Sequence, residues 1–119
     1  MKILVVEDEI LIQKSLVKML EKNGVQASGV AKGHDAIKLI KNNDYDRIVC
    51  DLMLQDISGF NVIEEAKKKY DKAEISKKFI IITAYSSEQI MEKAKKYQCK
   101  ILSKPFSNLQ TAIEIFISQ

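Results

Sequence analysis

The sequence has 119 residues, of which 46% are hydrophobic and 29% are charged, with 19 Lys+Arg against 16 Asp+Glu and one proline. We therefore expect residues 1–119 to form a single globular domain with a sizeable core. These fractions lie near globular averages and exclude a disordered chain, a collagen-like repeat or a disulfide-rich scaffold.

The sequence indicates neither a membrane nor a nucleic-acid partner. No apolar run approaches the roughly 18 residues that cross a bilayer, and the run 3–6 is too short for a signal-peptide core. Cys50 and Cys99 lack metal-site spacing and suit a reducing, cytoplasmic compartment. Residues 60–119 carry 11 basic and 7 acidic side chains, against 8 and 9 in residues 1–59. Because the lysines are interleaved with acids, they are typical of solvated helix faces.

Short apolar runs alternate with stretches of helical periodicity. The predicted strands are residues 3–6, 25–30, 48–50, 79–82 and 101–102, and the predicted helices centre on 12–20, 36–40, 62–66, 90–97 and 109–116. Asn23-Gly24 is a helix stop, and Ser86 with Gln89 and Ser107 with Gln110 have capping-box spacing.

This alternation predicts an α/β fold of (βα)₅ type. Strands that are almost continuously apolar and are joined by helices form a parallel sheet that is covered on both faces, with right-handed crossovers. The functional site of such a sheet lies at the carboxyl ends of its strands. The residues that follow each strand are therefore the candidates for function.

Acidic residues follow the first and third predicted strands. Glu7-Asp8-Glu9 comes after the first, and Asp51 comes after the third. If these strands are neighbours, Glu7, Asp8 and Asp51 converge, and two charges 4 Å apart repel by roughly 4 kcal/mol at an effective dielectric constant of about 20. The site then needs a raised pKa, a cationic partner or a metal. Because only oxygen donors are available, Mg²⁺ is the metal that they suit.

Two further strand ends supply a cation and a hydroxyl. Lys104 follows the fifth strand and Thr83 ends the fourth. A carboxylate beside magnesium, an ammonium and a hydroxyl is suited to attack on phosphorus, which predicts an aspartyl phosphate on Asp51. Taken singly, the acids can be turn or helix-cap residues, Thr83 a strand end and Lys104 a surface lysine. Their joint placement favours the site.

The same residues resemble the receiver domain of two-component response regulators, the CheY-like family, over essentially the whole chain. The motifs that carry the resemblance are Ile3-Leu4-Val5-Val6-Glu7-Asp8-Glu9, Val49-Cys50-Asp51-Leu52-Met53 with Gly59 eight residues after Asp51, Ile82-Thr83-Ala84, and Lys104-Pro105-Phe106. The resemblance implies a flavodoxin-like three-layer sandwich with five parallel strands in the order 2-1-3-4-5.

The resemblance also implies the roles of the site residues. Asp51 would accept phosphate from a histidine kinase or a phosphotransfer protein. Mg²⁺ would bind Asp8, Asp51 and the backbone carbonyl of Met53, and Glu7 through water. Thr83, the backbone amide of Ala84 and Lys104 would contact the phosphoryl group, and the Lys104-Pro105 bond would be cis. The protein would be a signalling switch rather than an enzyme, catalysing only its own phosphorylation and dephosphorylation.

Several positions depart from the family pattern. Gln55 stands where many receivers have proline, which predicts a less rigid loop, and Ile101 replaces the usual switch aromatic. Met53 and Tyr85 are bulky residues at positions that flank the path of hydrolytic water in the family. We hypothesise that they slow the loss of phosphate; the alternative is that they merely cover the strand ends.

Phosphorylation is expected to shift the face formed by the fourth helix (90–97), the fifth strand (101–102) and the fifth helix (109–116), and so to control a partner. No effector follows Gln119 in this sequence, so the expected output is another protein, a separate domain or a homodimer through that face. An alternative is a receiver-shaped binding scaffold that acts without phosphorylation. A flavin-binding electron carrier is disfavoured because Glu7-Asp8-Glu9 would repel the flavin phosphate. A phosphatase with an aspartyl nucleophile is disfavoured because Met53, two residues after Asp51, cannot act as the general acid.

Overall fold

Five parallel strands form one sheet in the computed structural model, which describes residues 1–85 and 87–118. They are β1 (Lys2–Val6), β2 (Gln26–Val30), β3 (Arg47–Asp51), β4 (Phe79–Thr83) and β5 (Lys100–Ser103). Their order is β2-β1-β3-β4-β5, which confirms the predicted sheet and makes β1 and β3 neighbours.

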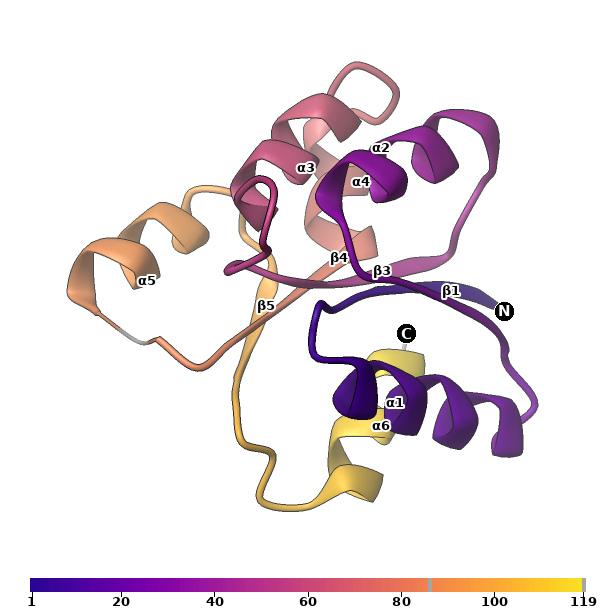
Figure 1. Cartoon of the computed structure of the whole chain (residues 1–119). Helices are drawn as coiled ribbons and strands as arrows, with labels where there is room; N and C mark the ends of the chain where they lie inside the picture. Colours follow the sequence, from indigo (N-terminus) through magenta and orange to yellow (C-terminus); the bar gives the residue numbers. More distant parts are fainter. Residues whose placement is uncertain (86, 119) are drawn as a thin grey trace.

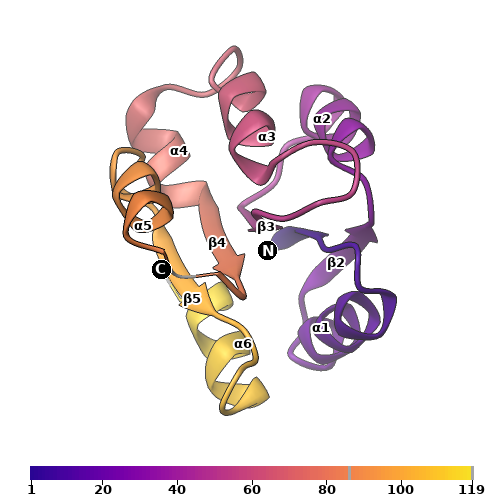
Figure 2. The same ribbon diagram turned by 60° about the vertical axis from the view of Figure 1, so that its left-hand side comes forward.

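Helices cover both faces of the sheet, giving the three layers visible in Figure 1. Helices α1 (Ile10–Lys22) and α6 (Leu109–Ile117) lie on one face, and α2 (Gly33–Asn42), α3 (Gly59–Ala66), α4 (Lys72–Lys78) and α5 (Glu88–Lys95) lie on the other (Figures 1 and 2). Among the described residues, no helix has the length and apolar character that a bilayer crossing requires.

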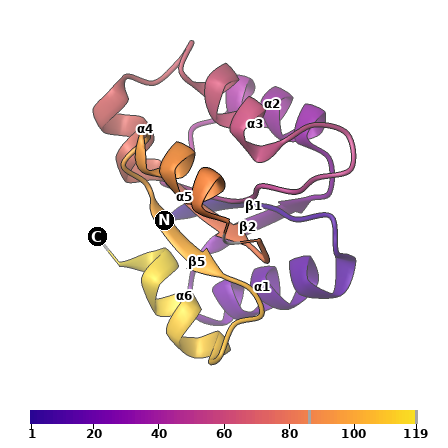
Figure 3. The ribbon, with the colours of Figure 1, turned by 90° about the vertical axis from the view of Figure 1, so that its left-hand side faces the viewer.

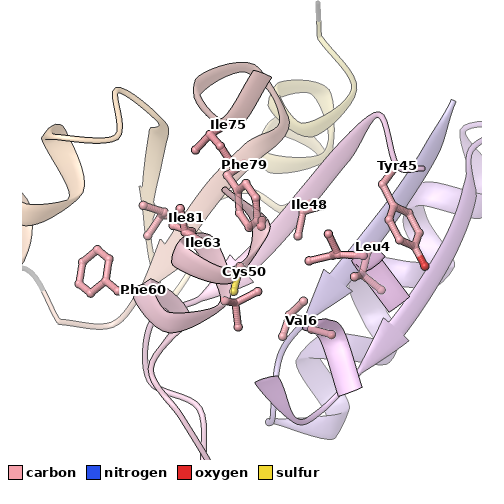
Figure 4. Close-up of a cluster of buried hydrophobic side chains, with 14 of the residues drawn as sticks. Leu4, Val6, Tyr45, Ile48, Cys50, Phe60, Ile63, Ile75, Phe79 and Ile81 are labelled. Carbon is pink, nitrogen blue, oxygen red and sulfur yellow. The ribbon is translucent and has the colours of Figure 1, made fainter. Parts of the chain in front are cut away.

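Alternate side chains of the central strands fill two separate cores. On β1, Ile3 and Val5 pack with α1 and α6, whereas Leu4 and Val6 pack with the helices of the other face (Figure 4). This alternation follows from the two-residue period of a strand, and both faces are apolar because both are covered. Burial of each such side chain stabilises the fold by roughly 1.5–3 kcal/mol.

One helix was not predicted from the sequence. Segment 72–78 folds as α4, in which only Ile75 is buried, so the apolar periodicity that marks a helix is missing. A capping box was nevertheless present: the Asp71 side chain accepts from the Glu74 amide, and the Glu74 side chain accepts from the Asp71 amide. Local capping therefore starts α4, and packing of Ile75 anchors it.

Two predicted helix caps were wrong by one residue. The N-cap of α5 is Ser87, whose side chain accepts from the Ile90 amide, and Ser86 lies outside the described residues. The N-cap of α6 is Asn108 rather than Ser107, and its side chain accepts from the Thr111 amide. Either neighbour is a good cap, so the sequence alone does not fix the register. The stop after α1 is confirmed, with Asn23 as C-cap and Gly24 at a φ of 79°.

Gly59 fixes the approach of α3 to the end of β3. A Cβ at this position would overlap the backbone of Asp51 and come within 2.9 Å of Leu52 Cα, and the Gly59 amide donates to the Leu52 carbonyl at 2.9 Å. The absence of a side chain thus lets the first turn of α3 pack directly on the segment that carries Asp51.

We expect Gly59→Ala to lower the free energy of unfolding by about 1–3 kcal/mol, because the new methyl group meets backbone that cannot rotate away. Urea denaturation measures the loss. Gly29→Ala is the comparison and should lose less, since the three atoms nearest its Cβ all belong to the Gln13 side chain, which can move, rather than to backbone. Equal losses in the two variants would contradict this explanation.

Candidate functional site

The polar residues singled out from the sequence lie at the carboxyl ends of four adjacent strands. Asp51 is the last residue of β3 and Thr83 the last of β4, whereas Glu7 and Lys104 directly follow β1 and β5. Glu7, Asp51 and Thr83 are nevertheless buried, with exposed fractions of 0%, 2% and 1%. The parallel sheet therefore gathers polar groups at one edge and shields them from water.

Lys104 joins the two acidic strand ends. Its Nζ lies 2.6 Å from Glu7 Oε1 and 2.6 Å from Asp51 Oδ2, and its side chain is 5% exposed. The Lys104 amide donates to the Thr83 carbonyl at 2.8 Å, which anchors the backbone, and the Lys104-Pro105 bond is cis, as the resemblance implies. One ammonium thus bridges two buried carboxyl groups.

Burial dominates the electrostatics of this site. Burial, and then the hydrogen bond with Asp51, raise the pKa of Glu7 to about 8, although Lys104 acts in the opposite direction. Burial alone would lower the pKa of Lys104, but its hydrogen bonds to Asp51 and Glu7 outweigh that effect and raise it. Lys104 is therefore held in its charged form, opposite a pair of acids that repel each other.

The acidic cluster also fits a divalent cation. Carboxylate oxygens of Glu7, Asp8 and Asp51 lie within 4.8 Å of one another. Glu7 Oε2 is buried and has no hydrogen-bond partner among the described residues, which leaves an acceptor that a cation or its water can satisfy. Hard oxygen donors in this number suit Mg²⁺, which keeps several of its waters.

The backbone after β3 orients the Asp51 carboxylate. The Met53 amide donates to Asp51 Oδ1 at 3.0 Å, and Lys104 occupies Oδ2, so both oxygens have fixed partners. Met53 also pairs with Ser58 in an isolated antiparallel bridge. These two contacts hold the Asp51 carboxylate in one orientation within the acidic cluster.

The loop between β3 and α3 has a second anchor. Asp56 accepts hydrogen bonds from the amides of Gly33 and His34 at 2.9 and 3.0 Å, and so caps the first turn of α2. This tether was not foreseen from the sequence, where Gln55 suggested only a less rigid loop.

Thr83 is the site residue that points elsewhere. Its hydroxyl donates to the Tyr85 carbonyl and accepts from the Tyr85 amide, each at 3.0 Å. In the described part of the chain, no hydrogen bond joins this hydroxyl to Asp51 or Lys104. The hydroxyl therefore stabilises the loop after β4, which also carries the exposed Ala84.

Two contributors to the site had no role in the sequence prediction. Glu9 Oε1 accepts from Lys104 Nζ at 3.2 Å, from an exposed position at the rim. The Gln13 side chain donates to the Glu7 carbonyl at 2.8 Å and ties the acidic loop to α1. Glu9 lies in the acidic run that marked the site, but no sequence signal distinguishes Gln13.

Comparisons with known proteins identify the family and agree with this fold. Residues 3–114 match the family described as "Response regulator receiver domain". The transcriptional regulatory protein TcrA of Mycobacterium tuberculosis is 37% identical over 68 residues, which is 57% of this chain and 27% of TcrA. The chain thus spans about a quarter of the length of that relative.

Solved structures of receiver domains have the same fold. A receiver domain protein (CheY-like) from Methanospirillum hungatei JF-1 has a TM-score of 0.85 at 24% identity, covering 96% of this chain and 88% of its own. The receiver domain of the sensor histidine kinase PA1611 from Pseudomonas aeruginosa PAO1 has a TM-score of 0.79 at 26% identity, covering 99% and 98% of the two chains. That structure is described with a magnesium ion coordinated in the active-site cleft.

The sheet order and the family match together define a receiver domain, which is a signalling switch. The chain belongs to the response regulator receiver domain family. It is therefore a receiver domain of two-component signalling.

We expect Mg²⁺ to raise the melting temperature, because a ligand present at 100 times its dissociation constant stabilises the fold by about 2.7 kcal/mol. Asp8→Asn should abolish the shift by removing one donor from the cluster. Glu21→Gln, at an exposed position of α1, should retain it. A shift that persists in Asp8→Asn, measured by differential scanning fluorimetry, would contradict the assignment of the metal donors.

Proposed function

We propose that this receiver takes a phosphoryl group onto Asp51 from the phosphohistidine of a histidine kinase or phosphotransfer protein. The observation that carries the proposal is the Lys104 ammonium held 2.6 Å from Asp51 Oδ2 within a buried acidic cluster. Such a cation, fixed before the reaction, can neutralise the charge that a phosphoryl group brings.

The reaction needs only the donor and this carboxylate. An Asp51 oxygen attacks phosphorus, the P–N bond of phosphohistidine breaks, and the imidazole nitrogen leaves with the electron pair and then takes a proton from solvent. Asp8 and Asp51, the Met53 carbonyl and, through water, Glu7 would hold Mg²⁺, which when bound shields the negative charge of the incoming phosphoryl group. Lys104 stays beside Asp51 and pairs with the phosphoryl oxygens as the charge arrives.

Thr83 supplies the link to the rest of the molecule. Its hydroxyl is engaged with Tyr85 in the structure, so a hydrogen bond to the phosphoryl group requires it to give up the Tyr85 carbonyl. The backbone amide of Ala84 would be the second donor to the phosphoryl group. The loop from β4 to α5 would then rearrange, and with it the face formed by α5, β5 and α6.

Ile101 lies half-buried on β5 within that face and packs against the core beneath α5. An aliphatic side chain can repack there without the swing of an aromatic ring. Control of an effector protein, or of a second copy of the chain, through this face is the output that we propose.

Incubation with a small phosphodonor and Mg²⁺ should add the mass of one phosphoryl group to the intact protein. Asp51→Asn should gain none, because its amide is not a nucleophile. Asp46→Asn, an aspartate at the opposite end of β3, is the control and should be phosphorylated normally. If the wild-type protein gains no phosphate, the chain acts instead as a phosphorylation-independent scaffold.

An apolar collar, defined here as Ile10, Leu11, Met53 and Tyr85, lies on the segments that follow β1, β3 and β4. All four side chains are exposed, and Leu11 is 83% exposed. These segments begin at the edge of the sheet where Asp51 lies. We therefore propose that the collar packs against the apolar surface around the histidine of the donor protein. Met53 and Tyr85 are also the residues proposed to slow hydrolysis, a hypothesis that stays a prediction.

Leu11→Asp should slow phosphorylation by a protein donor about tenfold, equivalent to about 1.4 kcal/mol of docking energy. Phosphorylation by a small phosphodonor should be unchanged, because that reagent needs no docking surface. Leu11→Met should behave like the wild-type protein. A loss with both kinds of donor, followed by intact mass over time, would show that the collar supports the site itself rather than docking.

A further inference from the structure

A groove of about 920 Å³ is lined by residues of α3, α4 and α5 and of the segments that follow α3 and α5. Figures 2 and 3 show how these three helices are arranged beside the sheet. None of Glu7, Asp8, Asp51, Thr83 and Lys104 lines it. Its walls come from three helices, and one of them, α4, was not expected from the sequence. The groove is therefore separate from the site described above.

The floor of the groove is aromatic and fixed. The rings of Phe60 and Tyr97 are stacked, with centroids 6.0 Å apart and an interplanar angle of 23°, and Ile75 of α4 adds an aliphatic surface. The Tyr97 hydroxyl donates to Glu64 Oε2 at 2.6 Å, which ties the end of α5 to α3. Burial, and then this hydrogen bond, raise the pKa of Tyr97 to about 12, so it remains a neutral donor.

The rim of the groove is basic. Four lysines line it, Lys67, Lys72, Lys93 and Lys96, against the two acids Glu64 and Glu92. Glu64 is already engaged, since it accepts from Tyr97 and lies 3.4 Å from Lys67 Nζ. Lys93 Nζ lies 4.7 Å from the centre of the Phe60 ring. Within the described residues, neither Lys72 nor Lys96 has an ion-pair partner, which leaves two cations to meet carboxylates from outside.

We propose that this groove binds an acidic amphipathic segment of a protein partner, with an apolar anchor on Phe60, Tyr97 and Ile75 and carboxylates on Lys72 and Lys96. A groove between helices with a buried apolar floor is suited to an amphipathic helix. A nucleic acid fits less well, because Glu64 and Glu92 would face its phosphates.

Two of the three helices that line the groove, α3 and α5, adjoin segments of the phosphoacceptor site. Ser58 and Phe60 line it directly beside Gly59, which packs on the Asp51 backbone, and Gln89 lines it on the helix that follows the Thr83 loop. Because these segments adjoin the site, phosphorylation of Asp51 should change the affinity of the groove for the acidic segment. Only this expected change rests on the proposed function. Binding of the acidic segment by the unphosphorylated protein does not depend on it.

The test uses a designed helical peptide with leucines on one face and glutamates on the other, titrated into ¹⁵N-labelled protein. We expect saturable shifts of the amides of α3, α4 and α5, and a binding constant that weakens as salt rises. The same peptide with lysine in place of glutamate should not bind. A single-stranded oligonucleotide is the competing probe, and saturation of the groove by it but not by the acidic peptide would overturn the proposal.

Reversing the charge of selected lysines distinguishes binding in the groove from nonspecific electrostatic attraction of the acidic peptide to the protein. The double variant Lys72→Glu with Lys96→Glu should bind the acidic peptide about tenfold more weakly. The matched variant Lys14→Glu with Lys18→Glu makes the same charge change on exposed positions of α1 and should bind within about twofold of wild type. Equal losses in both variants, or shifts confined to another face, would overturn the proposal.

The effect of phosphorylation is tested separately, by measuring peptide affinity on protein whose phosphorylation state is known from its intact mass. If the mass shows phosphate on Asp51 and the peptide affinity does not change, the groove is a constitutive docking site and the coupling is wrong. If no phosphate is added but the peptide still binds in the groove, the proposed function fails and the docking site stands.

Discussion

The ion cluster of Lys104, Glu7 and Asp51 is the interaction on which the rest of the structure depends. It places one ammonium 2.6 Å from each of two carboxyl groups that are almost completely buried. Removal of one member of such a cluster leaves uncompensated charge in the interior and typically costs about 3–5 kcal/mol. The fold tolerates this charge because a parallel sheet brings the ends of β1, β3 and β5 to one edge. In the function that we propose, the same cluster would supply the phosphoacceptor, Asp51, and the cation, Lys104.

The contacts around the cluster suggest a route by which phosphorylation would change the rest of the molecule. Asp51 is held by the Met53 amide and Lys104, Thr83 is held by Tyr85, and Gly59 holds α3 against the Asp51 backbone. A phosphoryl group on Asp51 would compete for Lys104 and Thr83, so that both the loop after β4 and its helix α5 would have a new preferred position. Since α5 borders both the β5 face and the groove, one movement would alter two surfaces.

Most of the fold and the convergence of the site residues could be predicted from the sequence. Continuous apolar strands such as residues 79–82 indicate burial on both faces, and the strand order implied by the family resemblance then places Asp51 beside Glu7. The sequence could not reveal α4, because its single buried residue, Ile75, leaves no periodic pattern. Nor could it show that the Thr83 hydroxyl turns toward Tyr85 or that Tyr97 stacks on Phe60. The first is a local choice of side-chain rotamer that residue types do not determine, and the second depends on tertiary packing between α3 and the end of α5.

We propose that Lys104 exchanges its present contacts with Glu7 and Asp51 for a phosphoryl group carried by Asp51. The most direct measurement is the side-chain ¹⁵Nζ signal of Lys104, recorded before and after phosphorylation and assigned with Lys104→Arg. We expect this signal to move once intact mass shows one phosphoryl group, while the signals of distant lysines such as Lys14 stay in place. A phosphorylated protein with an unchanged Lys104 signal would contradict it.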